Sequence, residues 1–182
     1  SQWTAIPVVG NHEFRPLDNG KERKLAIQWK PQFTLPVEKE LNTKLHETVY
    51  TVDYQDIRII VLNSNGKLED QTKYIDQQLK ASSAKWNIIT CHHSVFSPAK
   101  GRDFEYARKK WKPLFDKYKV DLALQGHDHT YTRGRVEPYE KNLLDGENVQ
   151  DLTGTVYVVS VSGGKMYKVK PGWEDYGALR DK

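Results

Sequence analysis

The sequence predicts an α/β fold in which strands end on candidate metal ligands. Three strand-like apolar runs stand out, at residues 6–9, 86–91 and 121–125, and segments with helical periodicity precede the last two. Each run leads within two residues into a side chain that can bind a metal: Asn11, His92 and His127. Because ligands of open α/β sheets bind beyond the carboxyl ends of strands, we expect these three ends to form the rim of one metal site.

The composition is that of an ordinary globular domain and points away from several classes of partner. Of 182 residues, 37% are hydrophobic and 29% are charged. The net charge of +4 helps to attract anionic substrates, but the densest basic stretch, residues 109–112, is interpreted as a solvated helix face. No apolar run is long enough to cross a bilayer, and no signal-peptide pattern opens the chain. We therefore expect neither a nucleic acid nor a membrane as partner.

The remaining pattern predicts further strands and two helices around this rim. Residues 14–45 have no clean period and are interpreted as a long loop with a short helix. Alternating or continuous apolar runs predict four more strands, the first two joined as a hairpin, at residues 48–52, 57–62, 131–136 and 155–161. Apolar residues at helical spacing predict helices over 70–81 and 104–118, the second kinked or split at Pro113.

His127 and His129 are separated by a single residue. In an extended segment this spacing points both imidazoles to the same face, where they serve a single metal or one each of an adjacent pair. Imidazole suits zinc, iron, copper and nickel, and the amide of Asn11 beside imidazoles favours a hard or borderline divalent ion.

The single cysteine, Cys91, and the remaining histidines have simpler interpretations. Cys91 faces away from His92 because neighbouring strand residues alternate, so we interpret it as a small buried hydrophobe. His46 is interpreted as an ordinary hydrogen-bonded histidine, and so is His93, which also lines the expected pocket.

Three motifs in this order resemble one family. Residues 10–13 read Gly-Asn-His-Glu, residues 86–92 form a strand that ends in histidine, and residues 126–129 read Gly-His-Asp-His. This series resembles the calcineurin-like metallophosphoesterases, and its details are most similar to the purple acid phosphatase branch. The resemblance extends from Ile6 to about Gly164.

The resemblance implies a fold and a set of roles. The fold is a four-layer sandwich of two mixed β-sheets flanked by helices, within the α/β (α+β) class. It implies that Asn11, His92 and His127 bind the second metal and His129 the first. His12 then contacts the phosphoryl oxygens or the leaving group without binding metal, and Glu13 orients its neighbours. Two metals are implied, iron with zinc or manganese.

The resemblance also implies two earlier motifs that supply the remaining metal ligands. Only nine residues precede Gly10, and none of them is Asp, Glu, His or Tyr. We therefore expect residues 1–182 to be a single partial catalytic domain, its C-terminal portion. Such a fragment would hold at most one well-formed metal site and be catalytically poor. Its natural partner is then the missing N-terminal part, and self-association is another way to cover its exposed strands.

The expected activity of the intact protein is hydrolysis of phosphate esters by two metal ions. The alternative is a phosphoesterase-like binding module without catalysis, which the aspartates of the two earlier motifs would distinguish. A metallo-β-lactamase-like hydrolase requires His-x-His-x-Asp-His, whereas Thr130, Tyr131 and Thr132 follow His129 here. A monoester, a diester and a nucleotide all remain open as substrates, and the resemblance alone favours an exported protein.

Overall fold

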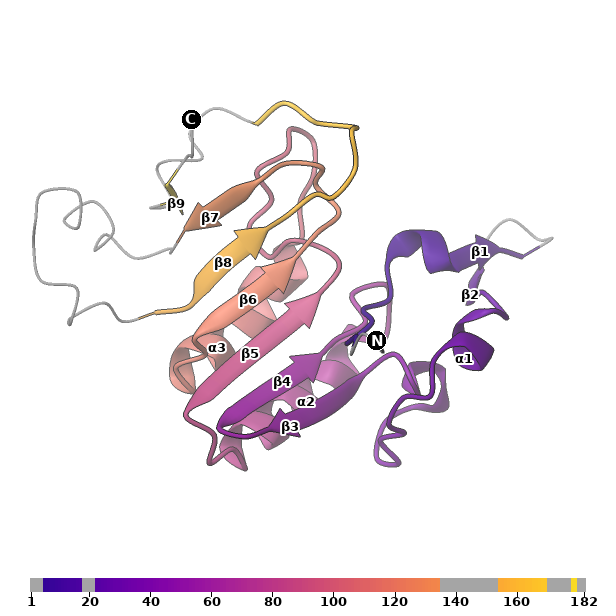
Figure 1. Cartoon of the computed structure of the whole chain (residues 1–182), viewed down its shortest axis with the longest axis vertical. Helices are drawn as coiled ribbons and strands as arrows, with labels where there is room; N and C mark the ends of the chain where they lie inside the picture. Colours follow the sequence, from indigo (N-terminus) through magenta and orange to yellow (C-terminus); the bar gives the residue numbers. More distant parts are fainter. Residues whose placement is uncertain (1–4, 18–21, 135–153, 170–177, 180–182) are drawn as a thin grey trace, which may run out of the picture.

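A seven-stranded mixed sheet organises the chain, as the computed structural model shows for residues 5–17, 22–134, 154–169 and 178–179 (Figure 1). Its strands lie in the order β3-β4-β5-β6-β8-β7-β9. They span Tyr50–Tyr54 (β3), Ile57–Val61 (β4), Trp86–Cys91 (β5), Leu122–Gln125 (β6), Thr132–Gly134 (β7), Val156–Val159 (β8) and Ala178–Leu179 (β9). Strands β4, β5, β6 and β8 pair in parallel, and the outer strands pair antiparallel. The carboxyl ends of the four central strands therefore meet at one edge.

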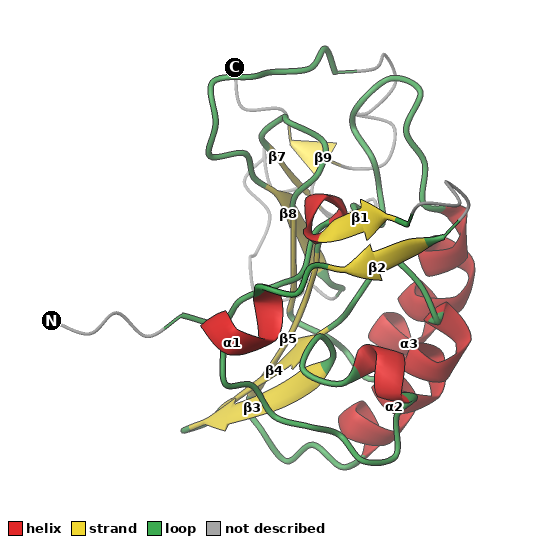
Figure 2. Ribbon diagram, turned by 90° about the vertical axis from the view of Figure 1, so that its right-hand side faces the viewer, coloured by secondary structure: helices red, strands yellow, loops and turns green. Residues whose placement is uncertain are grey.

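Helices cover one face of this sheet (Figure 2). They are α2 (Leu68–Lys80), a π-helical segment (Ala107–Trp111) and α3 (Lys112–Lys117). Large apolar side chains from the helices are fully buried against the sheet: Tyr74, Ile75, Trp111 and Phe115. Burying each such side chain contributes about 1.5–3 kcal/mol. The predicted helix over 70–81 and the predicted α/β class are confirmed.

The predicted helix over 104–118 changes type before its proline. The backbone N–H of Lys112 donates to the carbonyl oxygen of Ala107, which closes the π-helical segment, and α3 continues from there. Pro113 lies in the first turn of α3. Proline is tolerated in the first turn of an α-helix, where its fixed φ suits the helical backbone. The expected interruption is thus confirmed, as a π-to-α transition.

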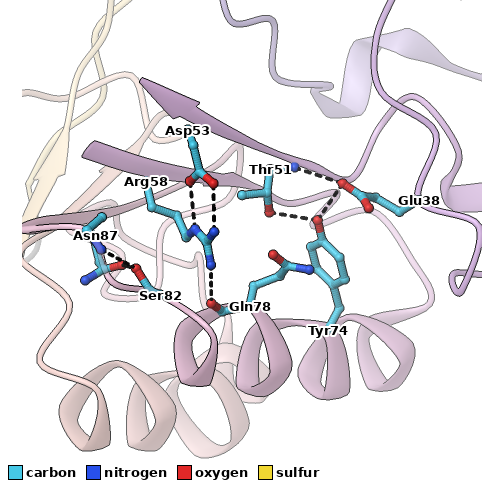
Figure 3. Close-up of polar contacts among 9 residues, drawn as sticks. Glu38, Thr51, Asp53, Arg58, Tyr74, Gln78, Ser82 and Asn87 are labelled. Atoms are coloured by element: carbon cyan, nitrogen blue, oxygen red, sulfur yellow. Dashed lines mark hydrogen bonds and ion pairs between the residues drawn. The ribbon is translucent and has the colours of Figure 1, made fainter. Parts of the chain in front are cut away.

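Polar contacts fasten the β3–β4 hairpin to α2 (Figure 3). The Arg58 guanidinium donates to both carboxylate oxygens of Asp53, at 2.7 Å each, and to the carbonyl oxygen of Gln78 at 2.8 Å. The Tyr74 hydroxyl donates to Glu38 at 2.9 Å and lies 2.7 Å from the Thr51 hydroxyl. The hairpin is therefore held by the helix as well as by its own ladder.

The segment interpreted as a long loop contains more structure than expected. It holds a small antiparallel ribbon, β1 (Phe14–Pro16) and β2 (Arg23–Leu25), and two short helices, α1 (Trp29–Gln32) and a 3-10 helix (Thr43–Leu45). The short helix was expected, and the ribbon was missed. Its strands are three residues each and mostly exposed, so they carry no apolar alternation that a sequence could reveal.

The predicted strand over 6–9 is wrong. These residues form no ladder with any other residue that the structure describes. Pro7 has no N–H to donate, and its carbonyl oxygen accepts from the Tyr50 hydroxyl at 2.6 Å instead. The apolar pattern reflects burial, since Val9 is fully buried. The predicted strand over 131–136 is described only as far as Gly134.

The second face of the sheet carries exposed apolar side chains. Strand register places Tyr54, Trp86 and Leu124 on the face opposite the helices, and they are 64%, 48% and 41% exposed. Figure 1 looks onto this face. The described residues form one large sheet and the β1–β2 ribbon, and a second large sheet is not among them.

Candidate metal centre

The ends of β5 and β6 lie side by side and place two of the candidate ligands. His92 follows β5, and its carbonyl oxygen accepts from the Gly126 N–H at 3.0 Å. His127 comes next with φ 68°, a left-handed conformation that is uncommon outside glycine. Asn11 starts a 3-10 helix, Asn11–Glu13, at the same edge. Three separate segments therefore deliver side chains to one place.

Three side-chain atoms that can bind a metal lie close together at this edge of the sheet. The side-chain oxygen of Asn11 lies 2.7 Å from His92 Nε2 and 3.1 Å from His127 Nδ1, and the two nitrogens are 3.1 Å apart. Two ligands bound at about 2.0–2.1 Å and at right angles lie about 3 Å apart, so this trio fits around one metal ion. Among the described residues, no three His, Cys, Asp or Glu side chains form a group that could bind a metal ion. The trio here differs from such a group because one of its three metal-binding atoms is the amide oxygen of Asn11.

Burial keeps these imidazoles neutral. Burial lowers the pKa of His92 below its usual value. Burial, followed by the charges of His93 and Arg102, lowers the pKa of His127 to about 3. Burial likewise lowers the pKa of His93 to about 4. A metal ligand must be deprotonated, so the cluster is prepared for a cation at neutral pH.

His129 contacts Lys165 and Tyr167. Its Nδ1 atom lies 3.0 Å from the carbonyl oxygen of Lys165, and its ring stacks on Tyr167 with centroids 4.5 Å apart. The expectation that His127 and His129 share one face of an extended segment is wrong, because His127 is left-handed and the segment is not extended. Its role as a ligand stays a prediction.

The turn that carries Asn11 depends on a glycine. The Gly10 N–H donates to Glu13 Oε2 at 2.7 Å, which closes the turn. A Cβ at residue 10 would lie 2.9 Å from that oxygen and 3.1 Å from the His92 ring. Gly10 therefore allows the turn to approach His92, and Glu13 lies where it can hold the turn in place. His12 projects from this turn as an exposed side chain.

The remaining histidines and the cysteine have ordinary partners. His93 Nδ1 lies 2.7 Å from the Ser64 hydroxyl, and its ring packs 4.3 Å from that of His127. His46 Nε2 lies 3.2 Å from the carbonyl oxygen of Leu41, as expected for a hydrogen-bonded histidine. Cys91 is buried, which raises the pKa of its thiol to about 12. The interpretation of Cys91 as a buried hydrophobe is confirmed.

Sequence reasoning missed Arg102. Its guanidinium contacts His127 Nε2 and lies 3.3 Å from the Tyr167 hydroxyl and 5.0 Å from the Tyr167 ring centroid. It also lies 3.8 Å from Asp128, whose carboxylate is buried and accepts no hydrogen bond from any described residue. Arg102 lies on the loop after β5, where no periodicity or spacing marks it.

Comparison with known proteins identifies the family. The sequence profile of the calcineurin-like phosphoesterases matches residues 2–131, and the chain belongs to this family. A purple acid phosphatase from Glycine max is 28% identical over 180 residues, covering 90% of this chain and 36% of its own length. Fe(3+)-Zn(2+) purple acid phosphatase 12 from Arabidopsis thaliana is 27% identical, covering 89% and 36%.

A solved structure shares the fold. It is the purple acid phosphatase PPD1 from yellow lupin seeds, with a TM-score of 0.63 and 23% identity over 90% of this chain and 32% of that one. The chain thus spans about a third of the length of these relatives. The expected resemblance to purple acid phosphatases is confirmed. No helix among the described residues is long and apolar enough to cross a membrane.

Proposed function

We propose that residues 1–182 form part of a catalytic domain, and that the intact protein hydrolyses phosphate esters at a dinuclear metal centre. The convergence of Asn11, His92 and His127 within 2.7–3.1 Å carries this proposal. In it, these three side chains bind one metal and His129 contributes to the other. The expected pair is iron with zinc or manganese.

The protein's own groups would then position the ester. Bound metals lower the pKa of a water molecule and neutralise phosphoryl charge. His12, exposed beside Asn11, donates a hydrogen bond to a phosphoryl oxygen or to the leaving oxygen. Glu13 keeps Asn11 and His12 in place through its hydrogen bond from the Gly10 N–H. His93 packs against His127 and limits the ways its ring can turn.

Arg102 supplies a cation to the same place. A guanidinium has only donors, so a hydrogen bond from Arg102 to His127 Nε2 would need the His127 proton on Nδ1. If His127 held a metal through Nδ1, it would need the opposite tautomer, and Arg102 would then no longer donate to His127 and would be available to phosphoryl oxygens. Arg102→Gln is expected to weaken phosphate binding to the metal-loaded chain and leave its metal content unchanged, by calorimetry and elemental analysis.

The exposed sheet face fits a partial domain. In this proposal, the face with Tyr54, Trp86 and Leu124 packs against the remainder of the catalytic domain in the intact protein. Helices already bury the opposite face of this sheet, and large exposed apolar side chains on the remaining face are typical of a surface that packs against another element.

Metal content is the direct test. The purified chain is offered iron, zinc and manganese in turn, and bound metal is measured by elemental analysis after gel filtration. We expect one metal equivalent in the wild-type chain and a large loss in His92→Ala and in His127→Ala. His46→Ala is the matched control, because His46 lies outside the trio, and it should keep its metal.

Two results would count against the proposal. A wild-type chain that binds none of the three metals would remove its main support. An equal loss of metal in His46→Ala and His92→Ala would mean that the metal is bound elsewhere or that histidine changes act through unfolding. Thermal unfolding of each variant without metal separates these two causes.

A further inference from the structure

Three of the four polar groups of His93 have hydrogen-bond partners. Its backbone N–H donates to the Ser64 hydroxyl at 3.0 Å, and its Nδ1 atom lies 2.7 Å from the same oxygen. Its carbonyl oxygen accepts from the Gln125 amide at 3.4 Å and from the Cys91 thiol at 3.3 Å. Within the part of the chain that the structure describes, the fourth group, Nε2, makes no hydrogen bond.

The Ser64 hydroxyl determines which ring nitrogen of His93 carries the proton. Ser64 is buried, and among the described residues His93 Nδ1 is the one acceptor within reach of its hydroxyl hydrogen. A buried O–H without an acceptor is unfavourable, so Ser64 donates to Nδ1 and the ring proton lies on Nε2. A doubly protonated ring also carries a proton on Nε2, so a donor at Nε2 does not depend on the charge of the ring.

Ser64 is itself held in the turn between β4 and α2. The buried Gln71 amide forms hydrogen bonds with both the backbone N–H and the carbonyl oxygen of Asn63. The Asn63 side chain in turn donates to the Thr48 hydroxyl at 3.0 Å. Ser64 therefore has little freedom to leave His93, and the His93 ring has little freedom to rotate.

The His93 ring lies beside both candidate ligand rings. Its centroid is 4.3 Å from that of His127 and 5.1 Å from that of His92. It does not complete the trio as a ligand, since no three His, Cys, Asp or Glu side chains among the described residues form a metal-binding group. Half-buried His93 thus forms part of the wall of the candidate metal centre, where a bound anion can meet its Nε2–H.

We infer that Ser64 positions His93 so that the Nε2–H of His93 donates a hydrogen bond to a phosphoryl oxygen of the substrate. The inference rests on the proposed function and adds one donor and its positioning residue to that site. A donor that is held in place before the substrate arrives loses little conformational freedom on binding. With its proton on Nε2, His93 stabilises negative charge on the phosphoryl group and does not accept a proton there from the attacking water.

The tautomer of His93 can be observed directly. Nitrogen–proton correlation spectra of the histidine side chains, recorded on the metal-free chain at neutral pH, show which ring nitrogen carries the proton. We expect a protonated Nε2 and an unprotonated Nδ1 for His93, whose signals are identified by their absence in His93→Phe. An unprotonated Nε2 would overturn the inference.

Inorganic phosphate is the probe for the donor itself. Titration calorimetry of the metal-loaded chain should show about tenfold weaker phosphate binding in His93→Phe, which keeps an aromatic ring beside His127 but has no N–H. Ser64→Ala should weaken phosphate binding by about threefold, because the His93 ring is then free to turn. Ser64→Thr keeps the hydroxyl and should restore the affinity.

His46→Phe is the matched control. His46 is another half-buried histidine with one ring nitrogen near a backbone carbonyl oxygen, and it lies outside the trio, so this variant should bind phosphate as the wild type does. Thermal unfolding verifies that each variant folds. A Ser64→Thr chain that folds with Nε2 of His93 protonated but binds phosphate as weakly as Ser64→Ala would overturn the positioning role of Ser64.

The inference and the proposed function fail separately. A chain that binds metal and binds phosphate equally well in the wild type and in His93→Phe would overturn this inference alone. Loss of metal in a folded His93→Phe chain would show that His93 is a ligand, which also overturns the inference. A chain that binds no metal but has a protonated Nε2 on His93 would overturn the proposed function and leave Ser64 as the residue that fixes the His93 tautomer.

Discussion

His12 is the residue on which the proposed chemistry can be tested most directly. It is exposed, and it lies between Asn11, which faces His92 and His127, and Glu13, which closes the turn. In the intact protein, His12→Ala is expected to lower turnover by about 10²–10³-fold, the effect of removing one preorganised donor to a developing charge. Metal content should be unchanged, because His12 is not placed as a ligand. Steady-state kinetics and elemental analysis measure the two effects.

The matched control is Arg15→Ala, which removes an exposed cationic side chain two residues beyond Glu13. It should leave turnover near the wild-type value if His12 acts through a specific contact. Loss of metal in His12→Ala would show that His12 is a ligand and that its proposed role is wrong.

His127 shows which features of single residues the sequence predicts and which it does not. The strand pattern correctly placed His92 and His127 at one edge, because β5 and β6 are parallel and bring their carboxyl ends together. Asn11 reaches the same edge, although residues 6–9 form no strand. The His-x-His spacing made His129 and His127 equally good candidates for metal ligands. The left-handed φ of 68° at His127 breaks that equivalence, and no sequence pattern predicts it.

The contact between β4 and α2 depends on one buried glutamine. Gln71 is fully buried, and its amide accepts from the Asn63 N–H at 2.8 Å and donates to the carbonyl oxygens of Asn63 at 2.8 Å and Gly66 at 2.7 Å. Gln71→Leu leaves these backbone groups without partners, so unfolding should become easier by about 2–4 kcal/mol. Urea unfolding followed by circular dichroism measures the loss.

Gln77→Leu provides the same change on the same helix at an exposed position. Its effect should stay within about 0.5 kcal/mol. If the two variants lost equal stability, helix propensity and not the buried amide would explain the result.

The β3–β4 hairpin should contribute a pH-dependent increment of stability. Hydrogen bonds from Arg58 hold the pKa of Asp53 below its usual value (Figure 3). A carboxyl whose pKa is lowered on folding stabilises the protein above its unfolded pKa, and this contribution is lost as pH falls through the folded pKa. Asp53 is 56% exposed, so solvent screens the pair and Asp53→Asn should cost at most about 1 kcal/mol at pH 7.

The difference between wild type and Asp53→Asn should narrow as pH falls below the usual carboxyl pKa of 3.8. Urea unfolding at a series of pH values measures it. A constant difference across the series would mean that Asp53 acts through its shape or its backbone and not through its charge.

Elements with a strong apolar signature were predictable, and those held by backbone contacts were not. Helix α2 and strands β4 to β6 bury side chains at regular intervals, and the sequence predicts each of them. The β1–β2 ribbon is held by its ladder and by hydrogen bonds from Arg23 to the carbonyl oxygen of Phe14, so it leaves no apolar pattern. The converse error occurred at residues 6–9, where burial without strand pairing produced a strand-like pattern.

For the molecule as a whole, the uneven covering of its sheet is the main consequence of the fold. Helices bury one face, whereas the other carries Tyr54, Trp86 and Leu124 at 64%, 48% and 41% exposure (Figures 1 and 2). Apolar surface of this kind drives association because removing it from water is favourable by about 25 cal/mol per Å². Among the residues that the structure describes, β3 is an edge strand of the sheet.

We expect the isolated chain to self-associate through this face. Sedimentation velocity over a range of concentrations should show a monomer that converts to a dimer. Trp86→Ser/Leu124→Thr should remain monomeric at concentrations where the wild type is dimeric, because the two side chains lie at opposite ends of the same face. Ile27→Thr/Met166→Ser is the matched control, since it removes side chains that are 80% and 58% exposed outside the sheet. An equal shift toward monomer in both double variants would mean that association depends on general hydrophobicity. A wild-type chain that stays monomeric would show that this apolar face is too small to hold a second copy, because a stable interface buries about 800 Å² on each partner.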